Sequence, residues 1–189
     1  MIAALGNLLC KTATFTGLSA LRSALTTHKP RILMYHSIAD DPGILPAALN
    51  VTPAVFERQL AYLTTHWNIV PLSTLADCIT KNIPFPPRAV ALTFDDGLLN
   101  NLTNAAPLLA RYRASATFYV VGQSLRGKPL WLHRWYALHH PRQNPNALQQ
   151  LSLILHTPVT SVRAGVQKLK YACPAEERDH ALDAVEHAC

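Results

Sequence analysis

The feature that most constrains the fold of this chain is a regular alternation of strand-like and helix-like segments between residues 31 and 122. Strand patterns cover residues 31–38, 69–72, 89–94 and 116–122, and helical patterns separate them at residues 53–66, 73–81 and 101–112. Strands alternating with helices predict parallel pairing with right-handed crossovers, in an open sheet or in part of a barrel. In both architectures, functional side chains gather at the carboxyl ends of the strands.

Local signals refine these segments. Thr52 is a predicted N-cap, because Pro53 follows it at the first helical position, and Ser73 or Thr74 is predicted to cap the next helix. The run AVALTF at residues 89–94 is apolar throughout, which is typical of a parallel strand covered on both faces. The run RILMYHSI at residues 31–38 is likewise predicted to form a buried strand.

After Gly122 the pattern changes to helices alone. An aromatic, histidine-rich helix (WLHRWYALHH) precedes a break at residues 141–146, and helical patterns follow at about 147–156, 161–171 and 175–188. We expect residues 126–189 to form a helical insertion or C-terminal segment. At the other end, residues 1–28 are predicted as an amphipathic helix that packs on the domain or contacts a membrane surface.

Composition narrows the functional classes. The chain has 189 residues, 49% of them hydrophobic and 15% charged, which is typical of a globular protein with a buried core. Its net charge of +6 favours anionic surroundings, but no basic block or aromatic-interleaved stripe is present, so we expect no nucleic-acid partner. No apolar run reaches the ~18 residues of a membrane span, and no secretion signal is evident, so a cytoplasmic location is expected.

The four cysteines (Cys10, Cys78, Cys173 and Cys189) show no metal-binding spacing. We expect reduced structural thiols.

Two adjacent acids, Asp95 and Asp96, follow the apolar run at 89–94 and precede Gly97. Adjacent carboxylates disfavour each other's ionisation, so a compensating charge or a function is expected. Phosphoryl transfer that uses two carboxylates requires them two residues apart, so that both point the same way. Asp95 and Asp96 are adjacent, which argues against that chemistry. Metal-assisted hydrolysis suits adjacent acids, because one can bind a cation while the other takes a proton from water. A structural turn that leads into the helix at 101 is the remaining interpretation.

Four stretches together resemble the polysaccharide deacetylase family, the NodB-homology carbohydrate esterases. They are RILMYHSI at 31–38, IVPLSTL at 69–75, ALTFDDG at 91–97 and ATFYV at 116–120. The resemblance implies a partial distorted (β/α) barrel with about four parallel strands in residues 29–125. It also implies hydrolysis of N-acetyl or O-acetyl groups on a polysaccharide.

The resemblance implies roles for individual residues. Asp95 matches the family's general base, Asp96 its ligand for a divalent metal, expected to be zinc, and His36 a general acid or substrate contact. The family's His-Ser/Thr-x-x-His motif is not found, since none of the nine histidines has another four residues later. His139 and His140 could substitute for it. The simpler expectation is that the chain is truncated before this motif.

Three functional hypotheses therefore remain open from the sequence. The first is a metal-dependent polysaccharide deacetylase, or a piece of one, acting on an acetylated glycan. The second is a non-catalytic remnant that binds carbohydrate or a partner through a half-barrel. The third is a membrane-associated basic helical protein whose aspartates are structural.

Overall fold

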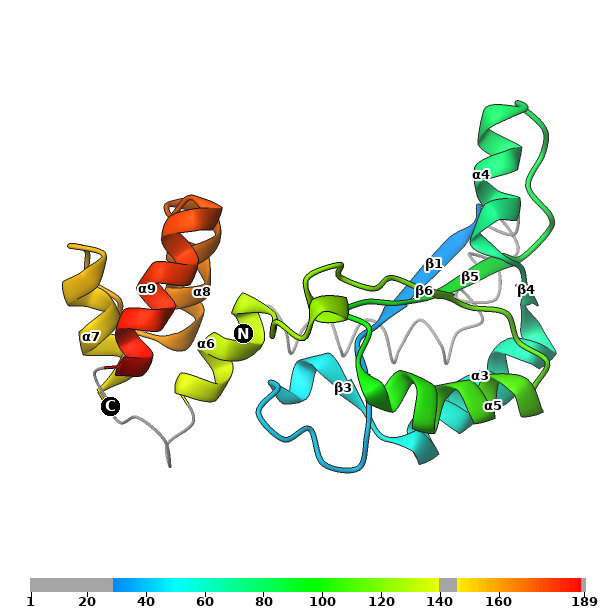
Figure 1. Cartoon of the computed structure of the whole chain (residues 1–189). Coiled ribbons are helices and arrows are strands. Elements are labelled where there is room, and N and C mark those ends of the chain that lie inside the picture. Colours follow the sequence, from blue (N-terminus) through cyan, green and yellow to red (C-terminus); the bar gives the residue numbers. More distant parts are fainter. Residues whose placement is uncertain (1–28, 140–145, 188–189) are drawn as a thin grey trace, which may run out of the picture.

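The computed structural model describes residues 29–139 and 146–187. The predicted amphipathic helix at residues 1–28 lies outside this part. Figure 1 shows a sheet flanked by helices on one side of the molecule and a group of helices on the other, with helix α6 between them.

The sheet is built around strand β5 (Ala89–Phe94), which pairs with three other strands. Strand β1 (Arg31–Tyr35) runs along the whole of β5, in a register from Arg31 opposite Val90 to Tyr35 opposite Phe94. Strands β4 (Asn68–Ile69) and β6 (Thr117–Phe118) pair with the beginning and the end of β5. All these pairings are parallel, which confirms the predicted α/β class with about four parallel strands.

Helices cover both faces of β5. Val90, Leu92 and Phe94 pack in one cluster with helix α3 (Pro53–His66) and helix α5 (Ala106–Arg111). On the opposite face, Ala89 and Ala91 pack in a cluster with residues of helix α4 (Leu72–Thr80). All six residues of β5 are buried, as the apolar run predicts.

The prediction of a buried strand over residues 31–38 is wrong for most of β1, in which only Tyr35 is buried. The side chains of Ile32 and Met34 are 58% and 62% exposed. They share a face with the alanines of β5, and no described element covers that face beside β1. The next short strand, β2 (Ser37–Ile38), is buried. It pairs in parallel with β3 (Asn50–Val51), which directly follows a 3-10 turn, η1 (Ala47–Leu49).

Helix starts follow the sequence signals unevenly. The hydroxyl of Thr52 accepts a hydrogen bond from the Val55 amide at 3.4 Å, so the predicted cap of α3 is confirmed. The predicted cap of α4 at Ser73 or Thr74 is wrong. That helix begins at Leu72, with Pro71 at the cap position and without a side-chain cap. The ring of Pro71 favours the extended backbone conformation that a residue just before a helix adopts. The start of α4 therefore depends on a proline and not on a capping side chain.

Three segments are shorter or differently wound than predicted. Of the predicted strand 69–72, only Ile69 belongs to β4. Only Thr117 and Phe118 of the predicted strand 116–122 join the sheet. The predicted helix 101–112 begins as a π-helical turn, η2 (Asn101–Ala105), before α5. Such turns insert an extra residue per turn and are frequent near functional sites.

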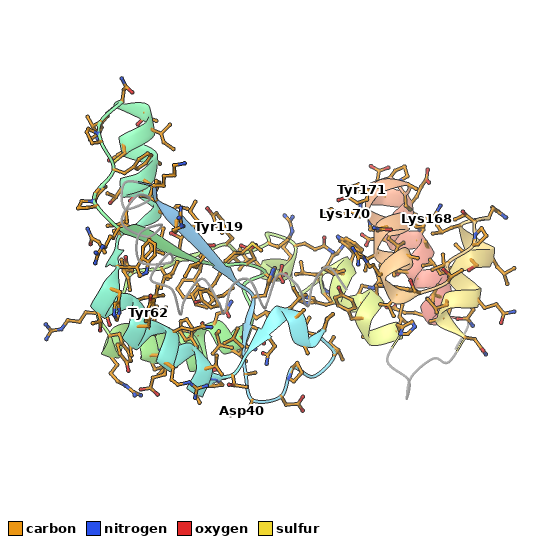
Figure 2. All side chains as sticks on the ribbon, turned by 180° about the vertical axis from the view of Figure 1, so that it is seen from behind. Asp40, Tyr62, Tyr119, Lys168, Lys170 and Tyr171 are labelled. Atoms are coloured by element: carbon orange, nitrogen blue, oxygen red, sulfur yellow. The ribbon has the colours of Figure 1, made fainter. Side chains whose placement is uncertain are left out.

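The C-terminal part is helical, as predicted. A 3-10 turn, η3 (Ser124–Arg126), leads to helices α6 (Trp131–Leu138), α7 (Ala147–Ile154), α8 (Val162–Tyr171) and α9 (Ala175–His187). They enclose a core of their own, formed by Trp135, Leu138, Ala147, Leu151, Val159, Leu169, Ala181, Leu182 and Val185. Lys168, Lys170 and Tyr171 of α8 lie at the opposite end of the molecule from Tyr62 of α3 (Figure 2).

Two further features bear on the sequence expectations. Cys78 and Cys173, which lie within the described residues, are buried free thiols. None of the helices described by the structure combines the length and the apolar character that a membrane crossing requires.

Candidate functional site

The aspartate pair lies where β5 ends and the chain reverses. The Asp95 amide donates to the Tyr35 carbonyl at 2.9 Å, so pairing with β1 extends one residue past the strand. Asp96 and Gly97 then both adopt left-handed backbone conformations, with φ of 72° and 65°. A left-handed aspartate is uncommon and occurs mostly in tight turns, so the turn aims the Asp96 carboxylate in a direction that a continuing strand would not.

His36 follows β1 directly and contacts this carboxylate. Its Nδ1 atom lies 3.1 Å from Oδ2 of Asp96, at hydrogen-bond distance. The side chains of both residues are about four-fifths buried, with exposed fractions of 20% and 19%. The parallel register places the ends of β1 and β5 side by side, which brings together residues 60 positions apart in the sequence.

A chain of polar side chains fixes the backbone that follows His36. The buried Ser37 hydroxyl donates to the Asn50 side chain at 2.6 Å and accepts from the Asn100 amide at 2.9 Å. The Asn104 amide donates to the Ile38 carbonyl at 2.7 Å. Buried polar groups are costly unless they are paired, so this satisfied network favours one position for β2 and hence for His36.

A second histidine reaches Asp96 from the helical segment. The Nε2 atom of His133, on α6, lies 3.6 Å from Oδ2 of Asp96, and the His133 side chain is 16% exposed. This distance exceeds hydrogen-bond length, so the contact is electrostatic. His133 Nε2 is itself buried, and it has no hydrogen-bond partner within the described residues.

The two imidazoles set the electrostatics of the site. His133 first and His36 second lower the pKa of Asp96, while partial burial of the carboxyl opposes them by favouring the neutral acid. Tyr136, one turn beyond His133, has a raised pKa because of its burial and the negative charge of Asp96. The Asp96 carboxylate is therefore held ionised among groups from two different parts of the chain.

A cleft of about 320 Å³ opens beside Asp96. Asp96, Gly97 and two leucines line one side of it, and residues 124–133 supply the rest through Ser124, Gly127, Lys128, Pro129, Leu130 and His133. The cleft thus joins the end of β5 to the start of the helical segment. Its lining mixes an acid, an imidazole, a hydroxyl and an ammonium group, which suits a polar ligand.

The donor set only partly fits a metal centre. One carboxylate and two imidazoles are ligands that zinc accepts, and three protein ligands are usual at a catalytic zinc. Within residues 29–139 and 146–187, however, no three His, Cys, Asp or Glu side chains are arranged to hold a metal ion. In this arrangement His36 bonds to Asp96 rather than standing beside it as a second ligand.

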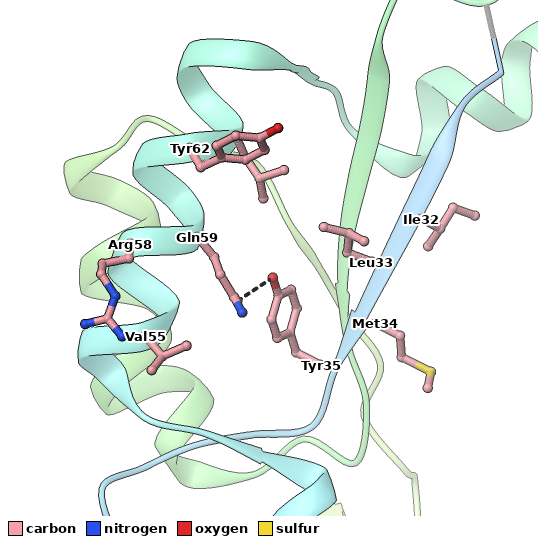
Figure 3. A pocket seen from close by; sticks show the side chains of 9 residues that line it. Ile32, Leu33, Met34, Tyr35, Val55, Arg58, Gln59 and Tyr62 are labelled. Atoms are coloured by element: carbon pink, nitrogen blue, oxygen red, sulfur yellow. Dashed lines mark hydrogen bonds between the residues drawn. The ribbon is translucent and has the colours of Figure 1, made fainter. Parts of the chain in front are cut away.

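The larger cavity, of about 620 Å³, lies elsewhere, between β1 and α3 (Figure 3). Apolar side chains dominate its lining, and Tyr35 donates a hydrogen bond to Gln59 across it at 3.0 Å. Arg58 is the one charged residue that the described part of the chain contributes to its lining. The cavity follows the edge of β1 that pairs with no described strand, and it offers packing surface rather than acid–base chemistry.

The structure therefore assembles part of the set predicted from the sequence. Asp96 and His36 contact each other, and Asp95 lies next to them. His139 does not join them, because it ends α6 with its ring 6.0 Å from that of Trp135, inside the helical segment. His140 lies outside the described residues.

His133 was missed by the sequence reasoning, although a signal was present. Trp131, Trp135 and Leu138 mark one apolar face of α6, and a residue two positions from Trp135 lies on the opposite face of a helix. A histidine on the face of α6 opposite its apolar residues was thus a candidate for contact with the strand ends.

Comparison with known proteins gives one family match and one curated relative. The family model described as polysaccharide deacetylase matches residues 82–148. The Bacillus subtilis (strain 168) protein named "Putative polysaccharide deacetylase YxkH" is 30% identical over 108 residues, which cover 55% of this chain and 37% of that protein. The chain thus matches little more than a third of the length of this relative.

Two solved structures are also similar in part. A polysaccharide deacetylase from Bacillus cereus is 31% identical, with 48% of this chain and 29% of that chain covered and a TM-score of 0.41. IcaB from Ammonifex degensii is 19% identical, with 82% and 80% covered and a TM-score of 0.46.

Proposed function

We propose, from the confirmed resemblance of this chain to the polysaccharide deacetylase family, that it takes part in removing acetyl groups from an acetylated polysaccharide. The reaction would be hydrolysis of an N-acetyl or O-acetyl group. One observation supports this above the others. The acids of the TFDDG stretch lie at the carboxyl end of the central strand, within the family match, and Asp96 lines a polar cleft.

Asp95 is proposed as the general base. A carboxylate at this position can take a proton from the attacking water while the water oxygen bonds to the acetyl carbon. The bond from that carbon to the glycan nitrogen or oxygen then breaks. The leaving group needs a proton, and His36, at the mouth of the same site, is proposed to supply it or to contact the substrate.

Asp96 is proposed as a ligand of a divalent cation, zinc by the family resemblance. Its ionised state and its partly buried position suit that role. The described residues do not make a complete metal centre around it, so the remaining ligands would have to come from outside the described residues.

A binding function without chemistry is the second candidate. The incomplete donor set favours it, because a cleft with one cation ligand can hold a glycan yet leave the acetyl group intact. This protein would bind acetylated carbohydrate and release no acetate.

The test is acetate release from an N-acetylglucosamine oligosaccharide with zinc present. We expect release by the unmodified chain and at least about 100-fold less by Asp95→Asn, in line with the loss of a general base. Asp77→Asn is the matched control, because Asp77 is an exposed acid whose ion-pair partner among the described residues is Lys81. Glycan binding without acetate release would favour the second candidate.

Zinc binding is measured separately by calorimetry, beside Asp96→Asn. One-to-one binding that the substitution abolishes would support the proposed ligand. Equal heats from both proteins would contradict it.

A further inference from the structure

The role of the helices after residue 130 is the open question of this fold, and one contact addresses it. His133 is the residue of α6 that approaches the end of β5, with Nε2 3.6 Å from Asp96 Oδ2. That nitrogen is buried and lacks a hydrogen-bond partner in the described residues. Burying an imidazole nitrogen without a hydrogen-bond partner costs free energy. Among the described residues, electrostatic attraction to the Asp96 carboxylate offsets this cost.

The opposite face of α6 is anchored in the helical core. Trp135 is fully buried, and its indole Nε1 donates to the Val162 carbonyl at 3.1 Å. The indole lies directly over Gly165 of α8, where a β-carbon would come within 2.4 Å of the ring. Such close packing leaves the helix little freedom to rotate about its axis.

Ion pairs fix a third face of α6. Arg134 Nη2 lies 2.6 Å from Asp183, and Arg134 Nε lies 3.0 Å from Glu186, both on α9. The Arg134 side chain is 13% exposed, whereas Asp183 and Glu186 are 52% and 41% exposed, so these pairs orient α6 more than they stabilise it. The direction of His133 is thus set by contacts that the next two residues, Arg134 and Trp135, make with α9 and α8.

We propose that His133 is a positioning residue for Asp96 and that helices α6–α9 form a wall of the catalytic cleft rather than an appendage. His133 and His36 both approach Oδ2 of Asp96, and the packing of α6 on α8 and α9 holds His133. The helical segment and the sheet are thereby coupled through one carboxylate. This proposal rests on the proposed function only in placing the site at Asp96.

A double-mutant cycle tests the coupling in the full chain, with a chelator present and without substrate. The variants are His133→Ala, Asp96→Asn and their combination, and the unfolding equilibrium is followed in denaturant. Asparagine is chosen because it tolerates the left-handed conformation of residue 96. We expect the two changes to be non-additive by at least about threefold in the unfolding equilibrium constant, which exceeds the scatter of independent sites.

Two comparisons separate positioning from general support of the fold. His180→Ala, an exposed histidine on α9, should combine additively with Asp96→Asn. His133→Gln keeps a nitrogen donor at similar reach and should restore part of the coupling. His133→Leu keeps volume without a donor and should not, and it replaces the alanine variant if that variant does not fold.

Amide hydrogen exchange gives a readout at the site itself. Amides at residues 95–98 should exchange faster in His133→Leu and return toward the original rate in His133→Gln. An additive cycle with unchanged exchange at 95–98 would overturn the proposal even if the chain releases acetate. A coupled cycle in a chain that releases none would contradict the proposed function and leave the positioning role intact.

Discussion

His36 and Asp96 are joined by a 3.1 Å contact although 60 residues separate them in the sequence. We expect His36→Ala to lower the free energy of unfolding by about 1 kcal/mol, because the Asp96 carboxylate loses a partly buried partner. Chemical denaturation measures this change. His66→Ala is the control, since His66 is exposed and bonds within its own helix. Equal losses in both variants would show that the contact adds nothing to stability.

The lowered pKa of Asp96 predicts how stability depends on pH. A carboxyl whose pKa is lower in the folded chain stabilises the fold above its ordinary pKa of 3.8. That contribution is lost as the pH falls through the folded-state value.

The measurement compares unfolding of the original chain and Asp96→Asn across this acidic range, with a chelator present. We expect the original chain to be the more stable at neutral pH and the difference to shrink below about pH 4. A constant difference at all pH values would show that the Asp96 charge makes no contribution.

Much of the fold followed from short-range signals in the sequence. The unbroken apolar run at 89–94 predicted a strand covered on both faces, and Thr52 followed by Pro53 predicted the start of α3. These signals work because burial and capping depend on residues near one another in the chain. The exposure of Ile32 and Met34 could not be predicted in this way, because it depends on what lies beside β1.

The site residues also divide into those that short-range signals predict and one that depends on tertiary packing. Asp95, Asp96 and His36 follow strands, and parallel strands end together, so the sequence predicted their proximity. His133 belongs to a helix whose placement depends on the packing of Trp135 and Gly165, which are 30 residues apart. Its contact with Asp96 is a property of that tertiary packing and carries no local pattern beyond the polar face of α6.

Gly97 combines a left-handed conformation with a close neighbour. Its φ is 65°, and a β-carbon there would lie 3.0 Å from Val120 Cγ1. We expect Gly97→Ala to cost about 1–3 kcal/mol in the free energy of unfolding. Gly127→Ala is the control, because Gly127 has a similar φ of 74° and nothing within 4 Å of the added carbon. The difference between the two variants, measured in denaturant, reports the Val120 contact alone, and no difference would show that Val120 moves aside freely.

Gly165 tests how tightly the helical core is packed. A β-carbon at this position would lie 2.4 Å from the indole ring of Trp135. Because that ring is fully buried, moving it away would disturb the residues packed around it. The added methyl group also favours helix, but by less than the overlap costs. We therefore expect Gly165→Ala to lower the stability of the helical segment by about 1–3 kcal/mol.

Tryptophan fluorescence during denaturation follows this change, since the Trp135 environment is altered directly. Gly122→Ala is the control, because the space around Gly122 is open and its backbone is not left-handed. That substitution should leave stability within about 0.5 kcal/mol of the original. A Gly165→Ala protein as stable as the Gly122→Ala protein would mean that α8 can move away from α6. The packing could not then hold His133 against Asp96, and the site would have to be organised from the sheet alone.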